Sequence, residues 1–380
     1  MTRRFSPNTG AVRALCTRLG IEHPIIQGPM GGGASTPELA AAVCNAGGLG
    51  SLACSYFKPE QIREGIAAIR RRTDRPFNVN LFAGGYAAPE PGFDPLPVLG
   101  VLSKHHAALG LPEPIPLPSP PNPFGEQLEA ILEARVPIFS FTFGIPAPED
   151  LARLRRQGVT ILGAATTVAE ARLLVDAGVD AVVAQGSEAG AHRGTFAVPF
   201  EAGMIGTIAL VPLVVAAVGG AVPVVASGGI MDGRGIVAAC ALGAGGVQMG
   251  TAFLATDEAG VPEVHKKLLL SASETRTSLT RAFSGRPARG IRNALMTDIE
   301  ELGAASIPPF PLQNALTRPL RTAAALKEDA ERLSLWAGQG ARMARRVSAA
   351  RLVALLAEEI EETLRDMGTP QTVTASMPPT

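Results

Sequence analysis

Short apolar runs recur along this chain, and most of them end in glycine or a polar side chain before a helical segment begins. Strands that alternate with helices in this way form a parallel sheet, because parallel neighbours need a long crossover connection. The pattern predicts eight strands, at residues 23–30, 49–53, 77–82, 136–143, 159–164, 179–184, 222–226 and 246–249. Eight strands with intervening helices are typical of a (β/α)8 barrel, an α/β fold that we expect over residues 1–256.

Two segments depart from this alternation. Residues 84–123 contain eleven of the chain's 32 prolines and predict an inserted, partly extended arm. A lid, an oligomer contact and a plain surface connection all remain open for it. Residues 257–367 predict a mostly helical extension that packs on the barrel, with helical runs at 262–271, 322–331 and 349–367. Residues 368–380 predict a disordered tail.

The charge and the cysteines narrow the class of protein. Lys and Arg number 34, as do Asp and Glu, so the net charge is zero and we expect no nucleic-acid or membrane partner. Residues 202–231 carry no charge, but prolines and glycines divide them too often for a membrane span. Residues 1–20 lack the apolar core of a signal peptide, and the four cysteines form no paired motif. These features predict a cytoplasmic protein with reduced thiols.

Glycine turns follow the last two predicted strands. They are Ser227-Gly228-Gly229 and Gln248-Met249-Gly250-Thr251. In barrels the backbone N–H groups of such turns, together with a helix start such as that near Asp232, bind a phosphate group. Plain tight turns are the alternative interpretation. Because aromatic residues make up only 4% of the chain, we expect a bound ring system to rest on small residues and Met30.

A single histidine, His192, lies in the glycine-rich loop after the strand at 179–184. Loops at the carboxyl ends of barrel strands carry the chemistry of this fold, so His192 is a candidate catalytic residue. A surface histidine in a flexible loop is the alternative. The pair His105 and His106 lies in the proline-rich arm without carboxylate or cysteine companions, so we expect both to be exposed and no metal to be bound.

Several of these motifs together resemble the nitronate monooxygenases, formerly 2-nitropropane dioxygenases, which are FMN-dependent TIM-barrel enzymes. The similarity spans residues 21–290. It is carried by the segments Pro24–Met30 (PIIQGPM), Ala46–Gly50 (AGGLG), Phe77–Phe82 (FNVNLF), Gln185–Gly194 (QGSEAGAHRG), Gln248–Thr251 (QMGT) and Gly285–Gly290 (GRPARG). One position departs from the family pattern, which commonly has Gly-Gly before the histidine where Ala191 stands here.

The resemblance implies an activity and a set of site residues. It implies oxidative denitrification of alkyl nitronates such as propionate 3-nitronate with O2, with His192 as the catalytic acid/base. The implied FMN contacts are Gln27, Gly28, Pro29, Met30, Asn80, Gln185, Gly190, Gly229, Gln248, Met249, Gly250 and Thr251. A homodimer is compatible with the sequence, which does not specify an oligomeric state.

Three alternatives remain beside this interpretation. An NAD(P)H-dependent enoyl or quinone reductase of the same fold shares the glycine-rich loop with its histidine, since a fold does not determine a reaction. An inosine-monophosphate-type dehydrogenase needs a nucleophilic cysteine in a rim loop, and Cys54 lies too early in the chain for that role. A non-catalytic nucleotide-binding barrel is less consistent with His192 beside Arg193.

Overall fold

The computed structural model describes residues 10–90 and 92–368, and its centre is a ring of parallel strands. The strands are β1 (Ile25–Gln27), β2 (Ser51–Ala53), β3 (Asn78–Phe82), β4 (Ile138–Thr142), β5 (Thr160–Ala165), β6 (Ala181–Gln185), β8 (Val224–Ser227) and β9 (Gly246–Met249). Their order in the sheet is β1-β9-β8-β6-β5-β4-β3-β2, and a bridge between Ile26 and Leu49 closes the ring. The predicted (β/α)8 barrel and all eight of its strands are confirmed.

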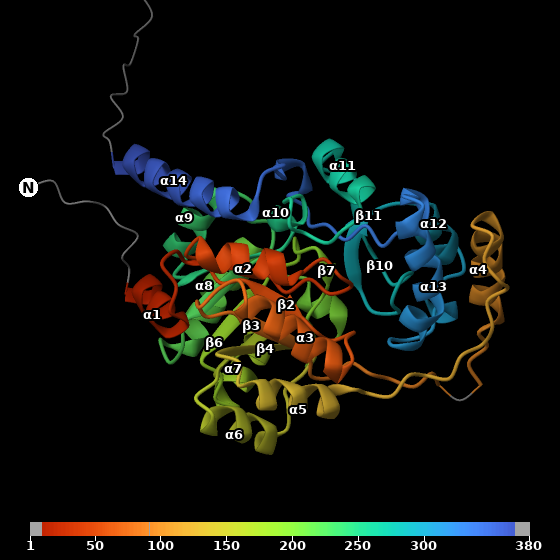
Figure 1. Ribbon diagram of the computed structural model, residues 1–380, viewed down its shortest axis with the longest axis horizontal. Helices are drawn as coiled ribbons and strands as arrows, with labels where there is room; N and C mark the ends of the chain where they lie inside the picture. The colour runs from red at the N-terminus through yellow and green to blue at the C-terminus, as the bar shows by residue number, and fades with distance from the viewer. Residues whose placement is uncertain (1–9, 91, 369–380) are drawn as a thin grey trace, which may run out of the picture.

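Helices surround the ring as the sequence pattern predicts (Figure 1). They are α2 (Pro37–Asn45), α3 (Pro59–Arg70), α5 (Phe124–Ala134), α6 (Pro148–Arg156), α7 (Val168–Asp176), α8 (Thr207–Val218) and α9 (Gly233–Ala241). Local capping explains several of the starts: Thr36 accepts a hydrogen bond from the Leu39 amide at 3.0 Å before α2. A further helix, α1 (Gly10–Leu19), precedes the barrel, and the short α10 (Thr251–Leu254) follows β9.

A second hydrophobic core lies beside the barrel and combines the arm with the C-terminal part of the chain. It contains α4 (Leu96–Ala108), α12 (Ala294–Glu300) and α13 (Leu312–Leu326), which Figure 1 shows grouped on one side of the molecule. The arm is therefore only partly extended, since residues 96–108 form a helix that local sequence did not reveal. Apolar side chains such as Val98 and Leu102 are fully buried, so contacts with α12 and α13 stabilise this helix.

The expectation that His105 and His106 are exposed is wrong. Both side chains are buried in the second core. His105 Nε2 lies 3.0 Å from the carboxylate of Asp298 on α12, and His106 Nδ1 donates to the Pro112 carbonyl at 2.7 Å. Burial lowers the pKa of His105. His105 therefore links α4 to α12, and His106 fixes the chain that follows α4. Among the described residues no group of histidine, cysteine and carboxylate side chains could hold a metal ion.

The C-terminal segment is less helical than predicted. Strand β11 (Ala288–Ile291) lies between β10 (Thr277–Thr280) and the two-residue β7 (Ala191–His192) in a three-stranded sheet. Helices α12, α13 and α14 (Ala349–Gly368) follow. Helix α11 (Glu263–Ser271) agrees with the run predicted at 262–271. The run predicted at 322–331 overlaps α13 only in part, because α13 begins ten residues earlier and ends at Leu326. Helix α14 packs against α9 and α2 of the barrel. The tail predicted at 368–380 lies, apart from Gly368, outside the described residues.

The uncharged stretch at 202–231 folds as predicted, with α8, a turn and β8. No helix within residues 10–90 or 92–368 has the length and apolar character needed to cross a membrane. The four cysteines are free thiols, and Cys44, Cys54 and Cys240 are buried.

Candidate active site

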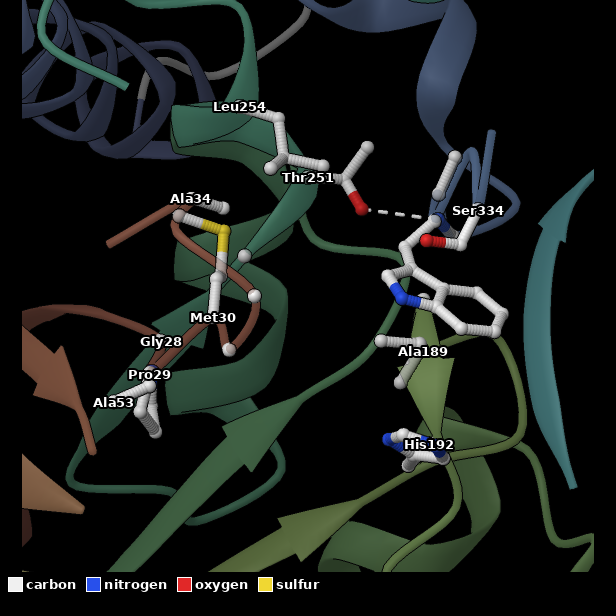
Figure 2. Close-up of a pocket in the computed structure, with 18 of the residues that line it drawn as sticks. Gly28, Pro29, Met30, Ala34, Ala53, Ala189, His192, Thr251, Leu254 and Ser334 are labelled. Atoms are coloured by element: carbon white, nitrogen blue, oxygen red, sulfur yellow. Dashed lines mark hydrogen bonds between the residues drawn. The ribbon is translucent and has the colours of Figure 1, made fainter. Parts of the chain in front are cut away.

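A cavity of about 560 Å³ opens where the barrel strands end, a size within the usual range for small-molecule sites. Its wall contains all but one of the residues for which the sequence implied a role in catalysis or cofactor binding. These are Gly28, Pro29, Met30, Asn80, Gln185, Gly190, His192, Gly228, Gly229, Gln248, Met249, Gly250 and Thr251. Figure 2 shows the segment from Gly28 to Met30 facing Ala189 and His192 across the cavity.

Gln27 is the exception, because its side chain is fully buried and does not line the cavity. Its Oε1 accepts a hydrogen bond from the Ser51 amide at 2.8 Å, and its Nε2 donates to the Ser35 hydroxyl at 3.1 Å. Gln27 therefore joins β1 to β2 and to the loop that carries Met30. Its role is to position that loop.

Gln185, at the end of β6, holds the loop that carries His192. Its Nε2 donates to the His192 carbonyl at 3.1 Å, and its Oε1 accepts from the Gly194 amide at 2.8 Å. Arg193 points away from the cavity into the protein, where its Nη2 donates to the carbonyls of Gln185 at 3.0 Å and Gly203 at 2.8 Å. The arginine beside the candidate catalytic residue thus stabilises the loop and does not line the site.

Strand β7 places His192 next to β11, with His192 paired to Ala288. His192 Nε2 lies 2.8 Å from the hydroxyl of Ser284, which itself donates to the Arg286 carbonyl at 3.2 Å. The single hydroxyl proton of Ser284 can go either to the Arg286 carbonyl or to His192 Nε2, so this contact fits both neutral tautomers of the imidazole. His192 Nδ1 has no hydrogen-bond partner in the described part of the chain.

Burial lowers the pKa of His192 to about 3, and the positive charges of Arg286 and Arg321 add to this effect. The imidazole is consequently neutral at ordinary pH. Of the acid and base roles that the resemblance implies for His192, a neutral imidazole fits only the base. Positive charge at this site comes from arginine side chains.

Aromatic side chains surround His192 more closely than the low aromatic content suggested. The Trp336 ring centroid lies 5.5 Å from that of His192, and those of Phe143 and Phe82 lie at 5.6 Å and 6.1 Å. Tyr56, in the loop after β2, also lines the cavity and meets Phe82 edge-on at 5.6 Å. The expectation that only small residues and Met30 would border a bound ring is therefore wrong for this part of the wall.

The glycine turns after β8 and β9 have the geometry that an anion site requires. Gly228 and Gly229 have φ of +116° and +72°, which favour glycine, and both border the cavity. The N–H groups of Gly229 and Gly250 donate to no other group among residues 10–90 and 92–368. The donor set therefore fits a phosphate. The first turn of α9 offers fewer free N–H groups for an anion than we expected. Asp232 accepts a hydrogen bond from the Gly235 amide, and Glu359 accepts one from the Gly233 amide, each at 2.9 Å.

Residues 312–340 form a wall of the cavity that the sequence did not reveal. The segment from Ser334 to Gly340 crosses the loop of Gly190, and the Gly338 amide donates to the Thr251 hydroxyl at 2.9 Å. An added Cβ on Gly190 would lie 2.5 Å from the Gly338 nitrogen, so the two backbone segments pack in direct contact at this point. Helix α13 adds Asn314, Arg318, Arg321 and Ala325. Their spacing of four, three and four residues was the only local signal of a shared face.

Comparisons with known proteins agree with this geometry. A family model described as nitronate monooxygenase matches residues 13–359. A probable nitronate monooxygenase of Staphylococcus aureus is 41% identical over 334 residues, which are 87% of this chain and 92% of that protein. The structure of a nitroalkane oxidase from Streptomyces ansochromogenes is similar with a TM-score of 0.84 and 43% identity, and covers 94% of this chain and 100% of that one.

FabK from Thermotoga maritima also has a similar structure, with a TM-score of 0.73, 32% identity and coverage of 93% of this chain and 97% of that one. The barrel, the cavity at its carboxyl end and these similarities define a flavin-dependent oxidoreductase. Within that class, the chain belongs to the nitronate monooxygenase family.

Proposed function

We propose that this protein uses FMN and O2 to convert alkyl nitronates to a carbonyl compound and nitrite. The observation that carries the proposal is one cavity at the carboxyl ends of the strands that contains two glycine turns suited to a phosphate together with the neutral imidazole of His192. His192 is the residue that we assign to catalysis. Bound flavin supplies the electron-transfer chemistry with O2.

The glycine turns support FMN as the cofactor. The amides of Gly229 and Gly250, with Gly228 and Thr251 beside them, would hold the single phosphate of FMN. Met30, Asn80 and Gln185 line the same cavity and would border the rest of the cofactor. The same donor set is compatible with the cofactor contacts that the sequence resemblance implied.

The chemistry of His192 favours a substrate that is already ionised. A base whose pKa lies near 3 removes a carbon-bound proton slowly, because proton transfer to it is uphill. A nitronate needs no such step, since its carbon has already lost the proton. The enzyme should therefore use nitronates faster than the corresponding neutral nitroalkanes.

Stopped-flow absorbance of the flavin tests the proposal. Under anaerobic conditions propionate 3-nitronate and propyl 1-nitronate should each reduce the flavin, and NADH and NADPH should do so only slowly. With air present, nitrite should be released. Chromatography of the chromophore freed by denaturation should identify FMN.

Two outcomes would contradict this assignment. Rapid bleaching by NADH or NADPH without bleaching by a nitronate would assign the protein to the reductases. A colourless protein that takes up no added FMN would exclude the cofactor.

A further inference from the structure

A second histidine borders the cavity. Besides His192, the imidazole of His265 on α11 is the only one in the wall among residues 10–90 and 92–368. Its side chain is buried, with only 4% of its surface exposed. The cofactor contacts that the sequence resemblance implied do not include it. A buried imidazole needs a hydrogen-bond partner for each nitrogen, because an unpaired polar group inside a protein is destabilising.

A backbone carbonyl sets the tautomer of His265. Its Nε2 lies 3.1 Å from the carbonyl oxygen of Trp336, which can only accept a hydrogen bond. Burial lowers the pKa of His265 to about 4, so the ring is neutral at ordinary pH and has a single N–H. That N–H is on Nε2. Nδ1 therefore carries a lone pair and is a hydrogen-bond acceptor.

This acceptor has no partner within the described part of the chain. The hydrogen bond of His265 to Trp336 involves Nε2 alone, and no backbone amide donates to Nδ1. Nδ1 is also absent from the polar atoms that the protein encloses completely. Because the side chain is otherwise buried and borders the cavity, the cavity is where a partner for Nδ1 can lie. A ligand at this position must offer a donor.

His265 lies between the two ends of the proposed cofactor site. The ring of Trp336, whose carbonyl accepts from His265, is 5.5 Å from the ring of His192. Two residues further along the chain, the Gly338 amide donates at 2.9 Å to the hydroxyl of Thr251, in the glycine turn after β9. This short segment therefore connects His265 both to the candidate catalytic residue and to the phosphate turn.

The neighbouring Lys266 holds α11 in place. Its side chain is buried, and Nζ donates to the carbonyls of Thr256 at 2.6 Å and Asp257 at 3.1 Å, just after α10. Since α10 begins at Thr251 in the phosphate turn, these bonds fix the position of His265 relative to that turn. An acceptor that is already in place loses little conformational freedom when a ligand binds.

We propose that Nδ1 of His265 accepts a hydrogen bond from a hydroxyl group of the ribityl chain of FMN. This chain joins the phosphate of FMN to the flavin ring. With the phosphate at the glycine turns and the ring beside His192, it would pass the part of the cavity that His265 borders. Its hydroxyl groups are the donors that the lone pair of Nδ1 requires. The inference rests on the proposed cofactor, but flavin binding tests it without turnover of a nitronate.

The binding test compares FMN with an analogue in which an unsubstituted pentyl chain joins the same ring to the same phosphate. The analogue lacks only the hydroxyl groups. Quenching of flavin fluorescence by the full-length protein freed of FMN gives both affinities. His265→Gln keeps an N–H for the Trp336 carbonyl but has no acceptor at the position of Nδ1. In this variant the Kd of FMN should rise roughly 3- to 10-fold, as for loss of one neutral hydrogen bond, and that of the analogue should not change.

Two further variants separate cofactor binding from a structural role. In His265→Asn the side-chain oxygen takes the place of Nδ1, but the amide is too short to reach Trp336, so FMN should bind within about twofold of wild type. His106→Asn is the matched control in the second core. It keeps a donor for the Pro112 carbonyl, lies outside the cavity and should bind both ligands as the wild type does.

The outcomes separate this proposal from the proposed function. If His265→Gln weakens FMN but not the analogue and no nitronate reduces the flavin, the acceptor role stands and the proposed reaction fails. If nitronates reduce the flavin but His265→Gln weakens both ligands equally, or neither, the acceptor role is wrong. Tighter binding of FMN by His265→Gln than by His265→Asn would assign His265 to holding Trp336 alone.

Discussion

The side chain of His192 owes its chemical state to three neighbours. Its Nε2 lies 2.8 Å from the Ser284 hydroxyl, a contact that orients the ring at the cavity wall. Burial and the charges of Arg286 and Arg321 keep the ring neutral. Arg286 is itself fixed over the Phe143 ring, with its guanidinium carbon 3.9 Å from the ring centroid. A single hydroxyl thus helps to hold the ring in its position.

Replacing that hydroxyl tests whether it positions the base. In Ser284→Ala the imidazole loses its hydrogen-bond partner, so it is held less firmly in the geometry that proton transfer needs. We expect kcat/KM for a neutral nitroalkane, which needs a base, to fall about tenfold, and that for the matching nitronate to change much less. His192→Asn should show the same selectivity with a larger loss. Equal losses on both substrates, measured at unchanged flavin content, would show that Ser284 serves structure alone.

The loop between β6 and β7 shows how one element combines strain with packing. Gly190 has no room for a Cβ because Gly338 lies against it. Ala191, the position at which the chain departs from the family's glycine, has φ of +59°, in the left-handed region. A Cβ in that region costs about 1–2 kcal/mol, so the loop bears strain next to the candidate catalytic residue.

Ala191→Gly should therefore stabilise the protein by about 0.5–1 kcal/mol, after allowing for the greater freedom of glycine in the unfolded chain. The matched control is Ala177→Gly at the end of α7, where φ is −72° and glycine gives no relief. The control should lose about 0.5–1 kcal/mol. Urea unfolding of both variants measures the two free energies. Effects of the same sign would show that Ala191 is not strained.

At the scale of the molecule, the cavity joins the barrel to the second core. His265 on α11 lies at this junction, buried and donating from Nε2 to the Trp336 carbonyl at 3.1 Å. Burial lowers the pKa of His265 to about 4, although this hydrogen bond opposes the shift. The unfolded chain therefore binds a proton between pH 6.5 and 4 that the folded protein excludes.

Stability should accordingly fall as the pH falls through this window. For His265 the loss between pH 7 and pH 4.5 is on the order of 2–3 kcal/mol. His265→Gln keeps an N–H donor for Trp336 but does not titrate, so its unfolding free energy should depend less on pH by that amount. Unfolding in urea at both pH values measures the difference. The same pH dependence in wild type and variant would contradict the low pKa of His265.

The sequence by itself determined the barrel and the residues at its rim. Strand periodicity, the glycine turns after β8 and β9, and the place of His192 after β6 are local patterns. In a parallel barrel the carboxyl ends of all strands meet at one rim, so knowing the strands is enough to bring those residues together. The resemblance to nitronate monooxygenases also depended on these local segments, and the family comparison confirmed it.

Only the tertiary structure decided what closes the site and how it is charged. Helix α13 and the segment 334–340 reach the cavity from far along the chain. No local pattern shows that Arg318 would line the cavity or that Trp336 would lie beside His192. Similarly, the burial of His105 and the inward direction of Arg193 depend on which surfaces pack against them. Packing partners distant in sequence set the burial and the electric field of a side chain, and these decide its chemistry.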